Sequence, residues 1–152
     1  MNYWLLKSEP TVYSIEDLKR DSKTLWDGVR NYQARNFLKS MAIGDRAFFY
    51  HSNTKPPGIV GLVEISQINQ IDPTQFDPQS HYYDGQSDPA NPRWHTVEVA
   101  FLERFSPGLS LDQLKASYSP EDLLVVRKGN RLSVLPVAKS IAERLLEQLR
   151  LP

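Results

Sequence analysis

Residues 46–68 read RAFFYHSNTKPPGIVGLVEISQI, and this central segment determines the architecture. Arg46–His51 is rich in aromatic residues and Ile59–Ile68 in β-branched and aliphatic ones, so both are typical of strands. Between them, residues 54–58 have the sequence TKPPG, in which proline and glycine favour a turn. The segment therefore predicts a β-hairpin, in which Gly61 marks a bulge or a close approach of the backbone.

Segments on either side of this hairpin add further strands and helices. Ser14 and Ser110 are each followed three positions later by a carboxylate or an amide, the pattern of a capping box that begins a helix. Asn31 is in position to cap a helix that Gly44 ends. We expect the remaining strands at residues 3–7, 94–105 and 131–135, a short helix from Ser119, and a final helix after Pro136.

This order of elements favours an α+β fold. The expected strands do not alternate regularly with helices, which disfavours a parallel sheet built from βαβ units. A small curved or barrel-like sheet, mostly antiparallel, with helices packed outside it, fits the order better. Residues 72–93 contain four prolines and no strand or helix pattern. We expect them to form a long loop that is either functional or mobile.

Composition indicates one globular domain over residues 1–152. The chain is 40% hydrophobic and 24% charged, which is ordinary for a soluble protein with its own core. It has no cysteine, which excludes disulfides, thiolate metal sites and a cysteine nucleophile. The N-terminus lacks the features of a signal peptide, and no apolar run is long enough to span a membrane. We expect an intracellular protein, cytoplasmic or, in a eukaryote, nuclear.

Charge is balanced overall but unevenly distributed. The chain has 18 basic and 18 acidic residues, whereas domains that bind duplex nucleic acid by general electrostatics are usually basic. Residues 19–55 hold eight Lys and Arg against three Asp, and residues 127–150 hold six against two acids. Either these two segments meet to form a basic face, or their charges are separate and solvated.

No motif for catalysis or metal binding is present. The three histidines, His51, His81 and His95, are not in metal-ligand spacing. His81 lies three residues before Asp84 in the long loop, where polar loop residues are the simpler interpretation. Phosphate-binding loops and nucleophile elbows are also absent. We therefore expect no cofactor, no metal and no enzymatic activity, with an enzyme kept as an alternative.

Several segments together resemble the EVE domain family over nearly the whole chain. The longest is WDGVRNYQARNFL at residues 26–38. The others are YWLLKSEP at 3–10, FFYHSN at 48–53 with PGIVG at 57–61, NPRW at 91–94 and RLSVLP at 131–136. The resemblance implies a PUA-like pseudo-barrel of about five or six mostly antiparallel strands with peripheral helices.

The same resemblance implies a function. PUA-like domains bind RNA or DNA, and EVE domains are thought to recognise modified bases, notably modified cytosines. We expect a non-catalytic nucleic-acid-binding domain that reads a modified base, with modified cytosine such as 5-methylcytosine in DNA as the first candidate. Its partner would be DNA or RNA bearing that base, with no membrane partner, and the chain would be a monomer. RNA or free modified nucleotide binding, an ASCH-like nucleic-acid-processing enzyme and a protein-interaction module are alternatives.

A base reader needs an aromatic pocket with a few fixed polar groups, because a base in a duplex must leave the stack. Stacking on an aromatic side chain contributes about 1–3 kcal/mol per base. Trp26 is the best candidate wall, and a core anchor is its alternative. The candidate ligand- or base-binding residues are Lys7, Ser8, Glu9, Trp26, Asn31, Tyr32, His51, Ser52, Asn53 and Gly58.

Basic residues near these positions are candidates for contact with the nucleic-acid backbone. They are Arg30, Arg35, Lys55, Arg127 and Arg131. Two of the candidate residues have equally simple structural interpretations. Asn31 is as suited to a helix N-cap as to a base edge. Arg35 lies one helical turn after Tyr32, where it would either contact a phosphate or be solvated.

Overall fold

The structure is a computed structural model that describes residues 1–151 of the chain. The strands are β1 (Tyr3–Ser8), β2 (Lys23–Leu25), β3 (Arg46–His51), β4 (Gly58–Ile71), β5 (His95–Ser110) and β6 (Val134–Val137). The α-helices are α1 (Ile15–Asp21), α2 (Tyr32–Ser40), α3 (Leu111–Ser117) and α4 (Lys139–Arg150). Two short 3₁₀ helices are η1 (Pro73–Phe76) and η2 (Leu124–Val126).

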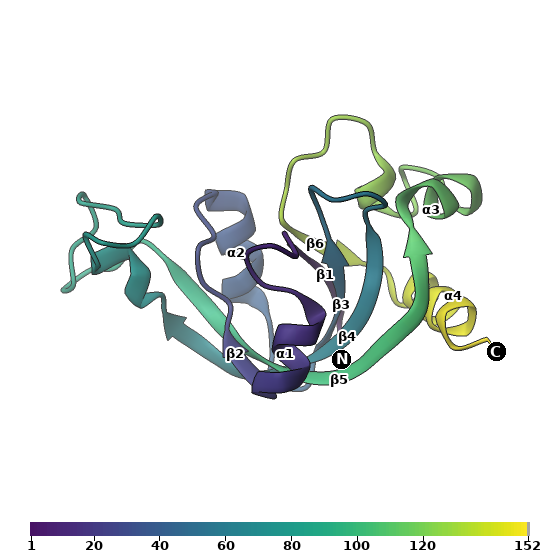
Figure 1. Cartoon of the computed structure of the whole chain (residues 1–152). Helices are drawn as coiled ribbons and strands as arrows, with labels where there is room; N and C mark the ends of the chain where they lie inside the picture. Colours follow the sequence, from purple (N-terminus) through teal and green to yellow (C-terminus); the bar gives the residue numbers. More distant parts are fainter. Residues whose placement is uncertain (152) are drawn as a thin grey trace.

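These strands form one six-stranded sheet in the order β2-β5-β4-β3-β1-β6 (Figure 1). Neighbouring strands are antiparallel except β1 and β3, which run parallel. The mostly antiparallel α+β architecture is therefore confirmed. The sheet bends strongly. It does not close into a barrel, because β2 and β6 remain edge strands.

The bend lies in the two longest strands. β4 and β5 pair through four register shifts, the first between Ile59 and Gly61. Such bulges increase the local twist of a strand. At Gly61 a Cβ atom would lie 2.4 Å from Cδ1 of Ile15, so only glycine lets α1 pack this closely on the sheet. The expected bulge and close approach at Gly61 are both confirmed.

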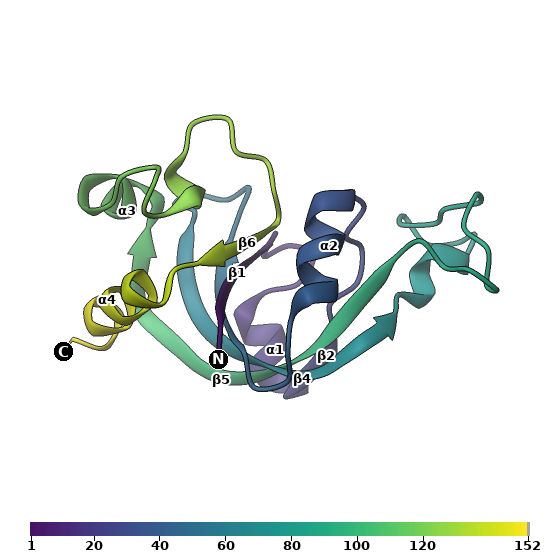
Figure 2. The ribbon, with the colours of Figure 1, turned by 180° about the vertical axis from the view of Figure 1, so that it is seen from behind.

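Helices cover both faces of the sheet, so the protein has two cores. Along β1, Tyr3 and Leu5 pack into one core while Trp4 and Leu6 pack into the other, because side chains alternate along a strand. α3 and α4 cover the first core, and α1 and α2 cover the second (Figures 1 and 2). None of the helices in residues 1–151 combines the length and apolar character that a membrane crossing requires.

Local capping signals predicted three of the helices correctly. The side chain of Ser14 accepts a hydrogen bond from the Asp17 amide, and Ser110 does the same for Gln113, so both capping boxes form. The helix expected at Ser119 does not form. Residues 119–123 make a turn in which the Leu123 amide donates to the Ser119 carbonyl at 3.0 Å, and η2 follows it.

Strand boundaries differ from the expectation at the C-terminal half. Strand β5 continues to Ser110, and the last strand begins at Val134 and includes Pro136. Proline is tolerated there because β6 is an edge strand. Strand β2 was not expected at all, since it has three residues and none is buried.

The long loop at residues 72–93 is an ordered arm held by a buried amide. Gln75 is fully buried, and its Nε2 donates to the carbonyl oxygens of Asp72 and Trp94 at 2.7 and 3.0 Å. Its Oε1 accepts from Ser87 Oγ and the Trp94 amide at 2.6 and 3.1 Å. The loop therefore has a fixed conformation relative to the start of β5.

Candidate functional site

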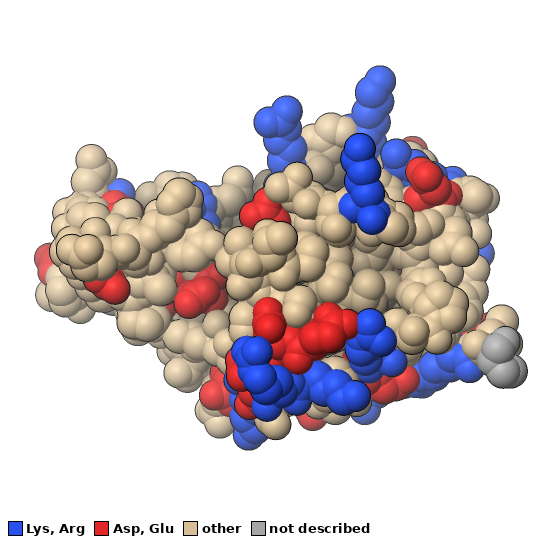
Figure 3. All heavy atoms as spheres, viewed as in Figure 1, with Lys and Arg blue, Asp and Glu red and all other residues tan. Residues whose placement is uncertain are grey.

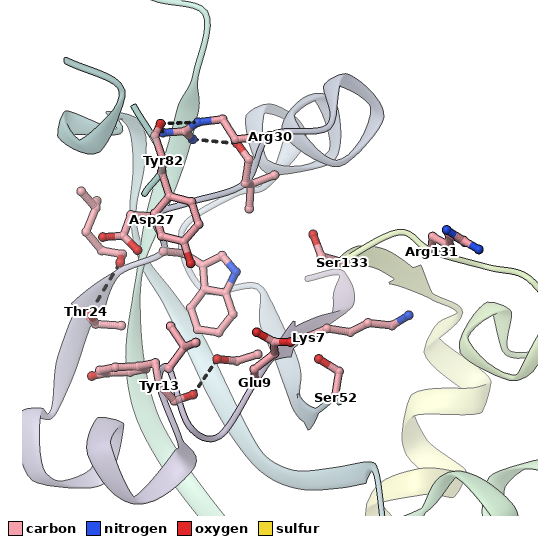
Figure 4. A pocket seen from close by; sticks show the side chains of 16 residues that line it. Lys7, Glu9, Tyr13, Thr24, Asp27, Arg30, Ser52, Tyr82, Arg131 and Ser133 are labelled. Atoms are coloured by element: carbon pink, nitrogen blue, oxygen red, sulfur yellow. Dashed lines mark hydrogen bonds between the residues drawn. The ribbon is translucent and has the colours of Figure 1, made fainter. Parts of the chain in front are cut away.

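A groove of about 700 Å³ opens where β1 ends. Its walls come from that strand end, the turn after it, the segment between β2 and α2, the long loop and the segment before β6 (Figure 4). Seven of the residues selected from the sequence line it, namely Lys7, Ser8, Glu9, Trp26, Arg30, Ser52 and Arg131. The structure thus brings residues from both ends of the chain to one cavity.

Trp26 combines the two roles considered for it. Its side chain is 7% exposed and meets the ring of Phe49 edge-on at 5.5 Å, as a core residue does. Its remaining surface lines the groove. The indole N–H of Trp4 donates to Asp45, and that of Trp94 donates to Asp84. Among residues 1–151, the indole N–H of Trp26 has no hydrogen-bond partner, and it is accessible to solvent. An anchored indole with a free donor therefore forms part of the wall.

The turn after Trp26 is fixed by the long loop. The Gly28 amide donates to Asp72 Oδ2 at 2.8 Å. Gly28 has a φ of +83°, and a Cβ atom there would lie 2.7 Å from the ring of Tyr82. Glycine is needed both for this conformation and for the ring packed on it. The loop therefore sets the position of Trp26 and supplies Tyr82 to the groove.

Arg30 is a structural residue in this network. Its Nη1 donates to Asp72 Oδ2 and the Val29 carbonyl, both at 2.9 Å. Its Nη2 donates to Thr74 Oγ1 and the Tyr82 carbonyl, and its Nε donates to that same carbonyl at 3.0 Å. All five guanidinium N–H groups have protein partners. The structure therefore gives Arg30 a role in holding the groove, and the predicted phosphate contact stays a prediction.

Asp72 at the centre of this network is ionised. The residue is 1% exposed, and burial by itself would raise the pKa of Asp72. Hydrogen bonds from Thr74, Gly28 and Arg30 outweigh that effect and hold the pKa below its usual range. The charged Asp72 is the counter-ion of Arg30, and it accepts the hydrogen bond from the backbone amide in the turn after Trp26.

Sequence reasoning missed several groove residues, among them Asp27, Tyr82 and Ser133. Asp27 lies in the family-like segment at residues 26–38 but was not selected as a site residue. Desolvation in the groove, and then the nearby charge of Asp72, raise the pKa of Asp27. Tyr82 belongs to the long loop, where sequence offered no signal for its position.

The end of β1 supplies polar groups to the groove floor. Ser8 Oγ donates to the Tyr13 carbonyl at 2.5 Å and so holds the turn that follows the strand. Glu9 accepts a hydrogen bond from Asn53 Nδ2 at 2.7 Å. Asn53 therefore supports the groove through Glu9 and is not among its lining residues.

Three predicted site residues have structural roles outside the groove. Asn31 Oδ1 accepts from the Ala34 amide at 3.0 Å and is the N-cap of α2. His51 Nε2 accepts from the Ile15 amide at 3.1 Å, at the start of α1. Gly58 packs on β5, because a Cβ atom there would lie 2.3 Å from the Leu109 carbonyl oxygen. None of the three lines the groove, and their predicted contact with a base stays a prediction.

Tyr32 and Arg35 form part of an external stack. The Tyr32 ring stacks on Trp94 at 5.0 Å, and the Arg35 guanidinium lies 4.7 Å from the centre of the Tyr32 ring. Arg35 also donates to the Arg93 carbonyl at 3.0 Å. Tyr32 thus packs outside the groove although it is 52% exposed, and its predicted contact with a base stays a prediction.

Exposed basic residues gather along one edge of the molecule. Figure 3 shows Lys and Arg side chains projecting over the β3–β4 turn and the segment between η2 and β6. These segments carry Lys55 in the first case and Arg127 and Arg131 in the second, all exposed. Other basic residues pair locally, as Arg20 does with Asp17 at 3.2 Å. The two basic segments of the sequence therefore meet only in part.

Metal ligands do not gather within residues 1–151, because no group of three or more His, Asp or Glu side chains is close enough to hold an ion. Asp84 in the long loop accepts from Trp94 Nε1 and the Gln86 amide at 2.8 and 3.0 Å. These contacts give it a structural role in the loop.

Comparison with known proteins identifies relatives of this architecture. A family model described as EVE domain matches residues 2–148. Thymocyte nuclear protein 1 from Homo sapiens is 44% identical, over 91% of this chain and 69% of the relative. A Pseudomonas syringae crystal structure has a TM-score of 0.92 and 46% identity, covering 96% of this chain and 98% of the other.

Two further structures are informative. Human THYN1 in complex with DNA containing 5-methylcytosine has a TM-score of 0.90 and 38% identity, covering 100% of this chain and 99% of that one. A Zymomonas mobilis ASCH protein has a TM-score of 0.51 at 14% identity, covering 97% and 98%, and shares the fold alone.

Proposed function

The chain belongs to the EVE domain family, and from this we propose that it is a non-catalytic reader of a modified base, with 5-methylcytosine in DNA as its ligand. The observation that carries the proposal is the groove beside Trp26 in a chain similar to human THYN1, which forms a complex with such DNA. The groove offers an indole, a phenol and several polar groups.

Recognition would proceed by extrusion of the base from its stack into this groove. Enzymes that act on a base reach it in this way, and a reader of a small modification faces the same steric problem. Trp26 would provide the apolar wall, and its free N–H and the Asp27 carboxylate would face donor and acceptor groups of the base. The fixed turn between β2 and α2 keeps these groups in place before binding, which lowers the cost of ordering them.

The polar contacts around the groove favour binding over catalysis. Ser8 Oγ donates to a backbone carbonyl, so its proton is not directed at a general base among residues 1–151. His51, a general-base candidate, faces the Ile15 amide. Glu9 is engaged by Asn53. Covalent catalysis requires a nucleophile paired with a general base. We therefore propose binding without catalysis.

The test is binding of short oligonucleotides that differ only in the 5-methyl group of one cytosine. Single strands, duplexes and RNA equivalents are measured at a stated salt concentration, with the wild type and Trp26→Phe. Phenylalanine keeps an aromatic ring but removes the indole N–H and part of the stacking surface. Affinity for the methylated strand should therefore fall by up to about 5-fold, which corresponds to ~1 kcal/mol, the lower end of the range for loss of a whole aromatic side chain. Phenylalanine retains most of the core contact with Phe49, and circular dichroism checks the fold. Equal affinity for methylated and unmethylated strands would contradict the proposal.

A free modified nucleotide is the second candidate ligand. The zero net charge of the chain gives little general attraction for a long polyanion. Titration with 5-methyl-2′-deoxycytidine compounds separates the candidates. A free compound that binds as tightly as the oligonucleotide would favour the small ligand.

A further inference from the structure

The groove has two chemically different halves. Figure 4 shows Tyr82, Asp27 and Thr24 on one side, and Lys7, Arg131 and Ser133 on the other. The first side also contains the indole of Trp26, which precedes Asp27 in the chain. One half is thus aromatic with a carboxylate, and the other carries two cations, a hydroxyl and the carboxylate of Glu9.

Lys7 is a cation without a counter-ion. Its side chain is half-buried at the end of β1, and its Nζ lies 6.0 Å from the centre of the Tyr50 ring. Within residues 1–151 it forms no ion pair, and burial lowers the pKa of Lys7. A desolvated ammonium group is stabilised when an anion approaches it. The charge of Lys7 is therefore available to a ligand in the groove.

Arg131 and Ser133 complete this half. The Lys7 amide donates to the Ser133 carbonyl at 2.9 Å, which fixes Ser133 beside Lys7. Among residues 1–151, neither the Ser133 hydroxyl nor the exposed Arg131 guanidinium has a hydrogen-bond partner in the protein. Glu9 also lies on this side, but Asn53 already donates to it. Three residues with donor groups, two of them charged, therefore line the same side of the groove.

We propose that Lys7, Arg131 and Ser133 bind the phosphate group attached to the nucleotide whose base occupies the aromatic half. This inference rests on the proposed base-reading function and defines its ligand more closely. The ligand is a whole nucleotide, bound at both its base and its phosphate. Arginine and lysine supply charge-assisted hydrogen bonds, which are about twice as strong as neutral ones. The phosphate belongs either to a DNA strand or to a free mononucleotide.

The first experiment compares free ligands by calorimetry. 5-Methyl-2′-deoxycytidine, its 5′- and 3′-monophosphates and inorganic phosphate are titrated into the wild type, Lys7→Met, Arg131→Gln and Lys139→Met. Lys139 is an exposed residue of α4 outside the groove, so its substitution removes one charge as a matched control. We expect one monophosphate to bind about 10-fold or more tightly than the nucleoside, and Lys7→Met to abolish most of that difference. If the nucleoside and both monophosphates bind with equal affinity, the phosphate group does not contribute to binding. That result overturns the proposal for a free nucleotide.

The second experiment tests the phosphate within DNA. A strand with one 5-methylcytosine carries a neutral methylphosphonate on its 5′ or 3′ side. The wild type should lose about 10-fold in affinity for one of these strands, whereas the loss should be clearly smaller in Lys7→Met, which keeps only the Arg131 and Ser133 contacts to the phosphate. This experiment also shows whether the phosphate contributes to binding if the affinities of the free compounds are too low to be compared. An equal loss in the wild type and Lys7→Met overturns the proposal, as does no loss in either.

The two experiments separate failure of this inference from failure of the base-reading function. A preference for 5-methylcytosine that persists without any effect of Lys7→Met or of the neutral linkage leaves base reading intact and removes the phosphate site. A phosphate effect without preference for the methylated base removes base reading and leaves the phosphate site. Binding that falls only with Arg131→Gln would overturn the role of Lys7.

Discussion

Replacing Asp72 by asparagine should destabilise the protein while leaving its shape almost unchanged. The carboxylate is buried and accepts from the Gly28 amide, Arg30 Nη1, the Thr74 amide and Thr74 Oγ1 at 2.8, 2.9, 2.8 and 2.5 Å. Asparagine removes the charge opposite Arg30 and turns one acceptor into a donor. Breaking a buried pair costs about 3–5 kcal/mol, and we expect about 3 kcal/mol because the Arg30 side chain is 21% exposed.

The assay is guanidinium unfolding followed by tryptophan fluorescence and far-ultraviolet circular dichroism. Glu16→Gln is the control, because it neutralises the exposed partner of Arg104 and should cost at most about 1 kcal/mol. The double variant Asp72→Asn/Arg30→Met tests the pair directly, since its loss should be smaller than the sum of the single losses. A change of less than about 0.5 kcal/mol in Asp72→Asn would refute the assigned role of this network.

The pH dependence of stability gives a second measurement of Asp72. Because the folded-state pKa is lowered, the unfolded chain binds a proton more readily than the folded chain does. The contribution is therefore complete above the ordinary aspartate pKa of about 4 and is lost as the pH falls through the folded-state value. Below about pH 5, the wild type should lose stability more steeply than Asp72→Asn.

Four further outcomes follow from the structure. Gly28→Ala should cost about 1–3 kcal/mol in chemical unfolding, because it forces a side chain into a left-handed turn against the Tyr82 ring. Asn31→Ala should lower stability by about 1 kcal/mol without changing oligonucleotide affinity, and a large loss of affinity would show that Asn31 contacts the ligand as well as capping α2. Tyr82→Ala should reduce the free energy of binding a methylated oligonucleotide by at least as much as it reduces the free energy of unfolding. Burial, followed by the charge of Arg104, lowers the pKa of His51, so stability should fall as the pH decreases from about 7 through the folded-state value. His51→Gln should flatten that slope in unfolding midpoints measured at several pH values.

Elements fixed by neighbouring residues could be predicted from sequence. The hairpin of β3 and β4 and the capping boxes at Ser14 and Ser110 depend on residues within a few positions of one another. The parallel pairing of β1 with β3 joins Tyr3 to Arg46, and nothing local to either strand specifies it. Strand β2 likewise exists only because it pairs with β5.

The groove shows the same division between local and distant information. Trp26 and Lys7 could be selected because each lies in a short segment with a recognisable pattern. The partners of Arg30 could not be predicted, because Asp72 and Tyr82 belong to a loop more than forty residues away. The conformation of that loop depends on the buried amide of Gln75, whose role no pattern around it indicates.

The two edges of the open sheet limit how copies of this protein can associate. An exposed edge strand is a template for pairing with another chain, and an open sheet has two such edges. Here β2 is only three residues long, and β6 contains Pro136, which has no N–H to donate. Neither edge offers a long ladder to an incoming strand. The architecture can thus remain open without inviting the sheet extension that leads to fibrillar aggregates.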